Sequence, residues 1–85
     1  MTAFYKCEII GSVSDRIFSC YTEVYYNEND SESKYEADLK AENKLISYFD
    51  ENLSMILGEI TSISIITIKP EEYYGMKKFP GEIFI

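Results

Sequence analysis

The residue types that most enzymes use for proton transfer are unevenly represented in this sequence. There is no histidine, which removes the commonest general base and every Ser-His or Cys-His pairing. Carboxylates are plentiful, but none of the four glycines stands in the spacing of a P-loop or a dinucleotide-binding loop. Because no nucleophile–base pair can be assembled from the remaining types, we predict a protein that is not an enzyme, with no catalytic residue and no cofactor.

The densest group of reactive side chains is the stretch YNENDSESKYEAD, residues 26–38. Against one lysine it carries the acids Glu28, Asp30, Glu32, Glu36 and Asp38. The stretch matches a calcium loop poorly, because Glu32 stands where glycine is needed and Asp38 falls inside a predicted helix. Cys7 and Cys20 are too few to build a zinc site by themselves. We therefore predict no metal site.

Tyrosines border these acids, and their pairing suggests recognition of another protein. Tyr25 directly precedes the stretch, Tyr26 is its first residue and Tyr35 lies inside it. Tyrosine is enriched in the cores of interfaces, and acids at a rim steer the encounter with a basic surface. We predict a partner-binding surface formed by Glu28, Asp30, Glu32, Glu36, Asp38, Tyr25, Tyr26 and Tyr35. The alternative is that the acids keep the chain in solution and each tyrosine is half-buried with its hydroxyl in water.

The net charge of −7 on 85 residues narrows the class of partner. Nucleic acids and anionic membranes would repel such a chain, so we expect a protein partner with a basic surface. The sequence contains no apolar run long enough for a signal peptide or a membrane span. A cytoplasmic protein with reduced thiols is therefore expected.

Two strands joined by a short turn are expected to open the chain. Apolar and polar residues alternate through 3–10, GSVSD at 11–15 is typical of a turn, and residues 16–26 are rich in β-branched and aromatic types. A hairpin with its tip at 13–14 places Cys7 opposite Cys20 on the apolar face. We interpret the two thiols as small core residues, with a cross-strand disulfide as the alternative.

A helix is expected next, beginning at the S-x-x-E pattern of Ser33 and ending at Asn52 or Gly58. Its main apolar stripe is predicted to follow Tyr35, Leu39, Glu42, Ile46, Phe49 and Leu53, widened by Ala41, Leu45 and Tyr48. Residues 60–68 form a third strand whose apolar phase changes midway. We favour a central strand parallel to the first, with a bulge as the alternative. Edge strands are expected at 72–77 and 82–85.

Together these elements predict an α+β fold, a two-layer sandwich of order β-β-α-β-(β) in one domain, 1–85. The small sheet is mainly antiparallel, and one amphipathic helix covers one of its faces. The opposite face, which carries Lys6, Glu8, Tyr21 and Tyr25, is expected to be open.

The small size, acidic charge, lack of histidine and element order, with acids beside tyrosines, resemble phage-encoded inhibitors of bacterial defence of the anti-CRISPR type. That resemblance implies an inhibitor that mimics nucleic acid and occupies a basic site on a nuclease or a CRISPR effector complex in the host cytoplasm. The alternative is a structural subunit that self-associates, for example as a homodimer. Its contacts would be exposed strand edges and the apolar residues 83–85.

Overall fold

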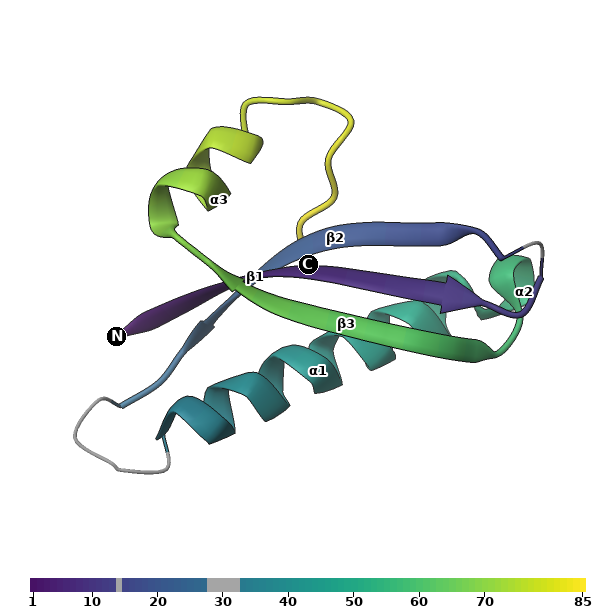
Figure 1. The fold of residues 1–85 in the computed structure, drawn as a ribbon, viewed down its shortest axis with the longest axis horizontal. Helices are drawn as coiled ribbons and strands as arrows, with labels where there is room; N and C mark the ends of the chain where they lie inside the picture. Colours follow the sequence, from purple (N-terminus) through teal and green to yellow (C-terminus); the bar gives the residue numbers. More distant parts are fainter. Residues whose placement is uncertain (14, 28–32) are drawn as a thin grey trace.

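The computed structural model describes residues 1–13, 15–27 and 33–85 and confirms the α+β class. The chain forms a three-stranded sheet of order β2-β1-β3 with one long helix across one face (Figure 1). The elements are β1 (Thr2–Gly11), β2 (Ile17–Tyr25), α1 (Ser33–Asn52), α2 (Ser54–Leu57), β3 (Ile60–Ile68) and α3 (Pro70–Met76).

The predicted hairpin register is confirmed. β1 and β2 pair antiparallel, with Cys7 opposite Cys20 and Ile9 opposite Phe18. Both thiols are free and completely buried in the main core. The hydrogen bond to Cys7 and burial together raise the pKa of the Cys20 thiol, so Cys20 stays neutral. The alternation of apolar and polar residues determined this register, because a slip of one residue would expose the whole apolar set.

Helix α1 begins at Ser33 and ends at Asn52, as predicted, but its predicted apolar stripe is partly wrong. The side-chain hydrogen bonds expected of Ser33 lie outside the described residues. The line that faces the sheet runs in steps of four through Ala37, Ala41, Leu45 and Phe49, all essentially buried. Two alanines allow the helix to approach the strands closely. Tyr35 and Leu39 are exposed, because the larger side chains of the first turns fall on the flank of the helix.

The prediction that the third strand is central and parallel to the first is wrong. β3 is an edge strand that pairs antiparallel with β1, which is the central strand. Helix α1 returns the chain to the hairpin end of β1, so β3 must run in the direction of β2. The register is continuous from Ser62 to Ile68, and its one irregularity lies opposite Gly11. The apolar phase changes because β3 contributes Ile63 and Ile65 to one face and Ile68 to the other.

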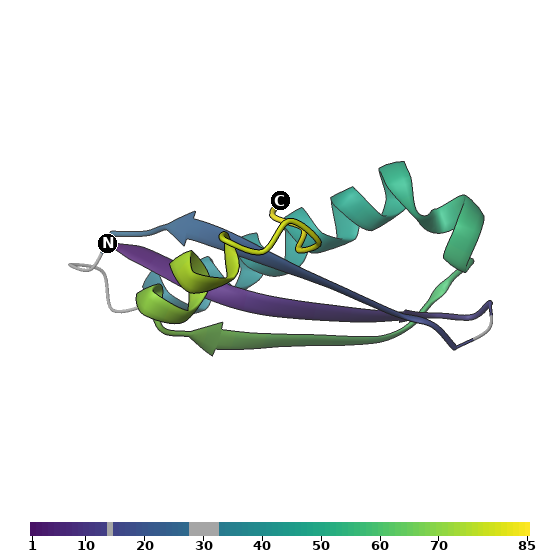
Figure 2. The same cartoon turned by 90° about the horizontal axis from the view of Figure 1, so that it is seen from above.

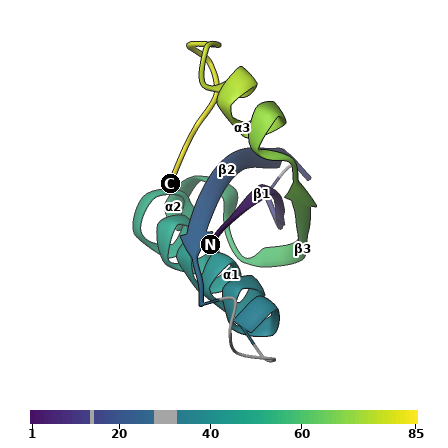
Figure 3. The ribbon, with the colours of Figure 1, turned by 90° about the vertical axis from the view of Figure 1, so that its left-hand side faces the viewer.

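The opposite face of the sheet is partly covered rather than open. Figures 2 and 3 show α3 and the C-terminal segment on this side and α1 on the other. Residues 70–76 form a helix instead of the predicted edge strand, because Pro70 suits the first helical turn and Glu71 and Glu72 complement the helix dipole. The C-terminal segment forms a single bridge, between Tyr21 and Phe84, beside β2.

Candidate interaction surface

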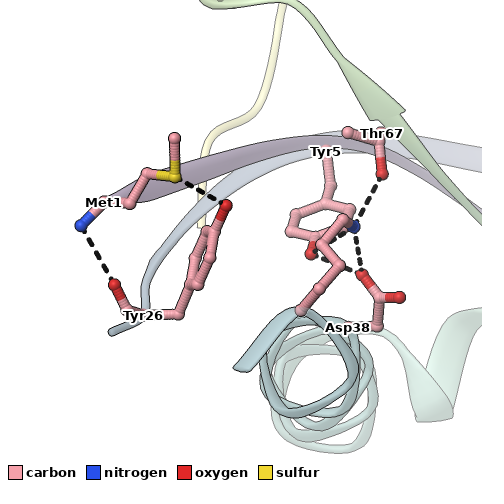
Figure 4. Close-up of polar contacts among 6 residues, drawn as sticks. Met1, Tyr5, Tyr26, Asp38 and Thr67 are labelled. Atoms are coloured by element: carbon pink, nitrogen blue, oxygen red, sulfur yellow. Dashed lines mark hydrogen bonds and ion pairs between the residues drawn. The ribbon is translucent and has the colours of Figure 1, made fainter. Parts of the chain in front are cut away.

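The start of α1 is joined to the sheet by a polar network (Figure 4). The Tyr5 hydroxyl on β1 donates to Asp38 Oδ1 at 2.6 Å, and Lys34 Nζ donates to the same oxygen at 2.7 Å. Lys34 also donates to Thr67 Oγ1 on β3 at 3.2 Å and to the Tyr5 oxygen at 3.4 Å. The network therefore links α1 to β1 and β3, and the carboxylate of Asp38 is engaged in contacts within the molecule.

Two opposing effects act on the pKa of Asp38. Partial burial raises the pKa of this carboxyl, but the hydrogen bonds from Lys34 and Tyr5 outweigh burial and lower it. Burial and the neighbouring Asp38 raise the pKa of the Tyr5 hydroxyl. At neutral pH the pair is therefore an ionised carboxylate that accepts from a protonated phenol.

The predicted site residues are distributed over different parts of the fold. Tyr25, at the end of β2, is 73% exposed, and Tyr35, on α1, is 66% exposed. Glu36 is exposed beside Tyr35. Tyr26 packs against the main core, and its hydroxyl donates to the Met1 sulfur at 2.9 Å (Figure 4). The predicted residues Glu28, Asp30 and Glu32 lie outside the described part of the chain.

The structure does not bring all the predicted tyrosines onto one face. Tyr25 follows the core residue Val24, so its side chain lies on the α3 side of the sheet. Tyr35 belongs to α1, which covers the other side. Among the described site residues, Tyr35 and Glu36 are therefore an exposed pair on one element, the first turns of α1.

Several other tyrosines have a structural role. Tyr73 is buried on α3 and packs against Phe4 with ring centroids 4.7 Å apart. Tyr21 stacks on Phe84, and Tyr74 meets the edge of Phe4. Lys77 Nζ lies 5.0 Å from the centroid of the Tyr73 ring. This second core holds α3 and the C-terminal segment against the sheet, so part of the tyrosine content is needed for folding.

Sequence reasoning missed an apolar surface at the side of β3. On the β2 side of α1, Lys44 donates to the Glu23 carbonyl and Tyr48 stacks on Phe18. On the β3 side of α1, Lys34 reaches Thr67 of β3, and Ile63 and Ile65 of β3 are half-buried. Tyr35 and Leu39 are exposed on α1. Positions 35, 39 and 46 were predicted on the main apolar stripe, so the sequence indicated their apolar character but not the exposure of Tyr35 and Leu39.

Half of the basic side chains make contacts within the fold, and many of the acidic side chains are exposed. Four of the eight basic residues are engaged: Lys6 with Glu8, Lys34 with Asp38, Lys44 with a backbone carbonyl and Lys77 with aromatic rings. Exposed acids occur on β2, α1 and α3 and in two connecting segments, namely Asp15, Glu23, Glu36, Asp38, Asp50, Glu51, Glu59, Glu71 and Glu72. Lys44 and Lys77 contact neutral groups in the described part of the chain. These contacts leave their positive charges unchanged, and the net charge of the protein is −7.

Comparison of the chain with protein-family models, curated proteins and solved structures found no match. Within residues 1–13, 15–27 and 33–85, no three cysteine or acidic side chains are grouped as metal ligands would be. None of the helices described here is long and apolar enough to cross a membrane.

Proposed function

We propose that this protein is a non-enzymatic inhibitor that presents an acidic surface to a basic, nucleic-acid-binding site on a partner protein, in the manner of the anti-CRISPR proteins that it resembles. The observation that carries the proposal is the net charge of −7. Among the described residues nine acids and seven bases are exposed, and three further acids, Glu28, Asp30 and Glu32, precede α1 in the sequence.

The binding surface is centred on the first turns of α1 and the acids that precede them in the chain. Glu36 and Tyr35 are exposed there and supply one charge and one aromatic anchor. Asp38 contributes less charge, because it is neutralised by Lys34 at 2.7 Å. Glu28, Asp30 and Glu32 add charge from the adjacent residues of the sequence.

The proposal is tested by capture and competition. The tagged protein is mixed with nuclease-treated bacterial lysate, and a captured protein is then tested for binding to DNA or RNA with and without the inhibitor. We expect the inhibitor to displace the nucleic acid, with an affinity that falls steeply between about 50 and about 500 mM salt. A partner whose nucleic-acid binding is unaffected would contradict the proposal.

A matched pair of variants separates a defined surface from general charge. The first variant neutralises the proposed surface with Glu28→Gln, Asp30→Asn, Glu32→Gln and Glu36→Gln. The control removes the same charge elsewhere with Asp50→Asn, Glu51→Gln, Glu71→Gln and Glu72→Gln. We expect the first to weaken binding by about tenfold or more and the control by less than about threefold. Equal weakening by the two variants would contradict this choice of surface.

A further inference from the structure

The free edge of β3 is a row of backbone groups that no described element covers. β3 is hydrogen-bonded to β1 on one side, and Figures 2 and 3 show no described helix or strand beyond its other side. The opposite edge of the sheet differs, because the C-terminal segment bonds to β2 there: Tyr21 N donates to the Ile83 carbonyl and Ile85 N donates to the Tyr21 carbonyl. An uncovered edge is a template for another strand.

The outward bonds of Tyr21 determine which groups of β3 are free. Successive residues of an antiparallel strand direct their backbone groups to opposite sides. The backbone N–H and C=O of Tyr21 are directed away from β1. Those of its neighbour Cys20 are therefore directed toward β1, where they form backbone hydrogen bonds with Cys7. The even-numbered residues of β1 then bond to the even-numbered residues of β3. The residues of β3 that direct their N–H and C=O groups to the free edge are Ile63, Ile65 and Thr67.

The side chains at this edge lack the usual protection against pairing. Edge strands are normally protected by charge, proline or a covering segment. The nine residues of β3, ITSISIITI, include no charge and no proline. The bulge opposite Gly11 breaks the regular pairing only at the first residues of β3. Ile66 is 53% exposed on one face of the edge, and the half-buried Ile63 and Ile65 lie on the other.

The charges that flank β3 indicate which strand would pair with it. Glu59 precedes the strand and Lys69 follows it, both exposed and both five residues from Ser64. In an antiparallel pair of two copies centred on Ser64, Glu59 of each copy lies opposite Lys69 of the other. The same register places Ile63 of each copy opposite Ile65 of the other. The backbone N–H and C=O groups that these residues direct to the free edge then form the hydrogen bonds of an antiparallel pair.

We propose that β3 pairs with β3 of a second copy of this chain in this register, which forms a homodimer with one continuous sheet. The half-buried side chains of Ile63 and Ile65 meet those of the second copy along this edge and lose water on pairing. The complementary ends offset part of the repulsion between two chains of net charge −7. This inference does not depend on the proposed inhibitor function, because the dimer is measured without any partner.

Cysteine cross-linking tests the register. In this pairing Ser64 faces Ser64 of the second copy at a non-hydrogen-bonded position, where Cα atoms lie about 4.5 Å apart, within reach of a disulfide. Ser64→Cys should therefore form a dimer on mild oxidation with oxidised glutathione, seen on a non-reducing gel. The control is Ser62→Cys, also exposed on β3, whose thiols would be about 13 Å apart. Equal cross-linking of the two variants would overturn the register.

A charge swap tests the partner choice, with mass in solution as the readout. Wild type should sediment at twice 9.9 kDa at high concentration. Glu59→Lys or Lys69→Glu alone creates two like-charge contacts and should weaken the dimer by about threefold to tenfold. The double variant should restore wild-type affinity, and circular dichroism should show that all three variants fold. A wild type that stays monomeric to about 1 mM, a concentration set by the affinity scale, or a double variant that is not restored, would overturn the proposal.

Discussion

Removal of the Tyr5 hydroxyl should destabilise the fold mainly through its hydrogen bond to Asp38. The ring of Tyr5 is buried and its hydroxyl donates to Asp38 at 2.6 Å, so Tyr5→Phe keeps the packing and loses this bond. It also loses the longer bond from Lys34, at 3.4 Å. A hydrogen bond to a charged group contributes about 1.5–3 kcal/mol when it is shielded from water. The Asp38 side chain is 50% exposed, so we discount this to about 1 kcal/mol.

The destabilisation should depend on pH in a defined direction. The pKa of Asp38 is lowered in the folded protein, so its contribution to stability is present above its unfolded pKa of about 3.9. That contribution is lost as the pH falls through the folded pKa. The difference between wild type and Tyr5→Phe should therefore be largest near neutral pH and shrink toward about pH 2.

Thermal and urea unfolding followed by circular dichroism measure the effect. For a domain of this size, about 1 kcal/mol corresponds to a fall in Tm of about 4–8 °C. Asp38→Asn and the double variant complete a cycle that isolates the coupling between the two side chains. Tyr26→Phe is the matched control, because its hydroxyl donates to a weak thioether acceptor and should matter by less than about 0.5 kcal/mol. A loss for Tyr5→Phe no larger than for this control, or one that does not change with pH, would refute the reasoning.

Two further pairs of substitutions test the packing, each by thermal unfolding. Gly11→Ala should destabilise the protein by about 1–3 kcal/mol, because a Cβ at Gly11 meets the Leu57 backbone. Gly75→Ala meets open space on α3 and should be neutral or stabilising by up to about 1 kcal/mol. A larger loss of stability for Gly75→Ala than for Gly11→Ala would contradict the contact of the hairpin with α2. Leu45→Asp should abolish cooperative unfolding because Leu45 is fully buried, whereas Leu39→Asp should retain it because Leu39 is 42% exposed; equal effects would show that the orientation of α1 is wrong.

The candidate site was only partly predictable. Tyr25 was predicted on the open face of the sheet and is exposed, whereas Tyr35 was predicted in the apolar stripe of the helix and is exposed instead. The internal use of Asp38 could not be predicted, because Tyr5 lies 33 positions away and meets it only when α1 packs on the sheet. Burial of Tyr21 and Tyr73 in the second core likewise depends on α3, a segment that the sequence predicted as a strand.

Local pattern by itself determined the hairpin register, the facing cysteines and the start of α1, and it left Asn52 and Gly58 as two choices for the end of the helix. Each of these depends on neighbours in the sequence: alternation sets the strand faces, and the S-x-x-E pattern marks the first turn of the helix. Tertiary structure decided the rest. β1, not β3, is central, because α1 returns the chain to the hairpin end and β3 then pairs antiparallel with β1 as an edge strand. The phase of α1 was decided by close packing on the sheet, which selects Ala37 and Ala41 over larger side chains.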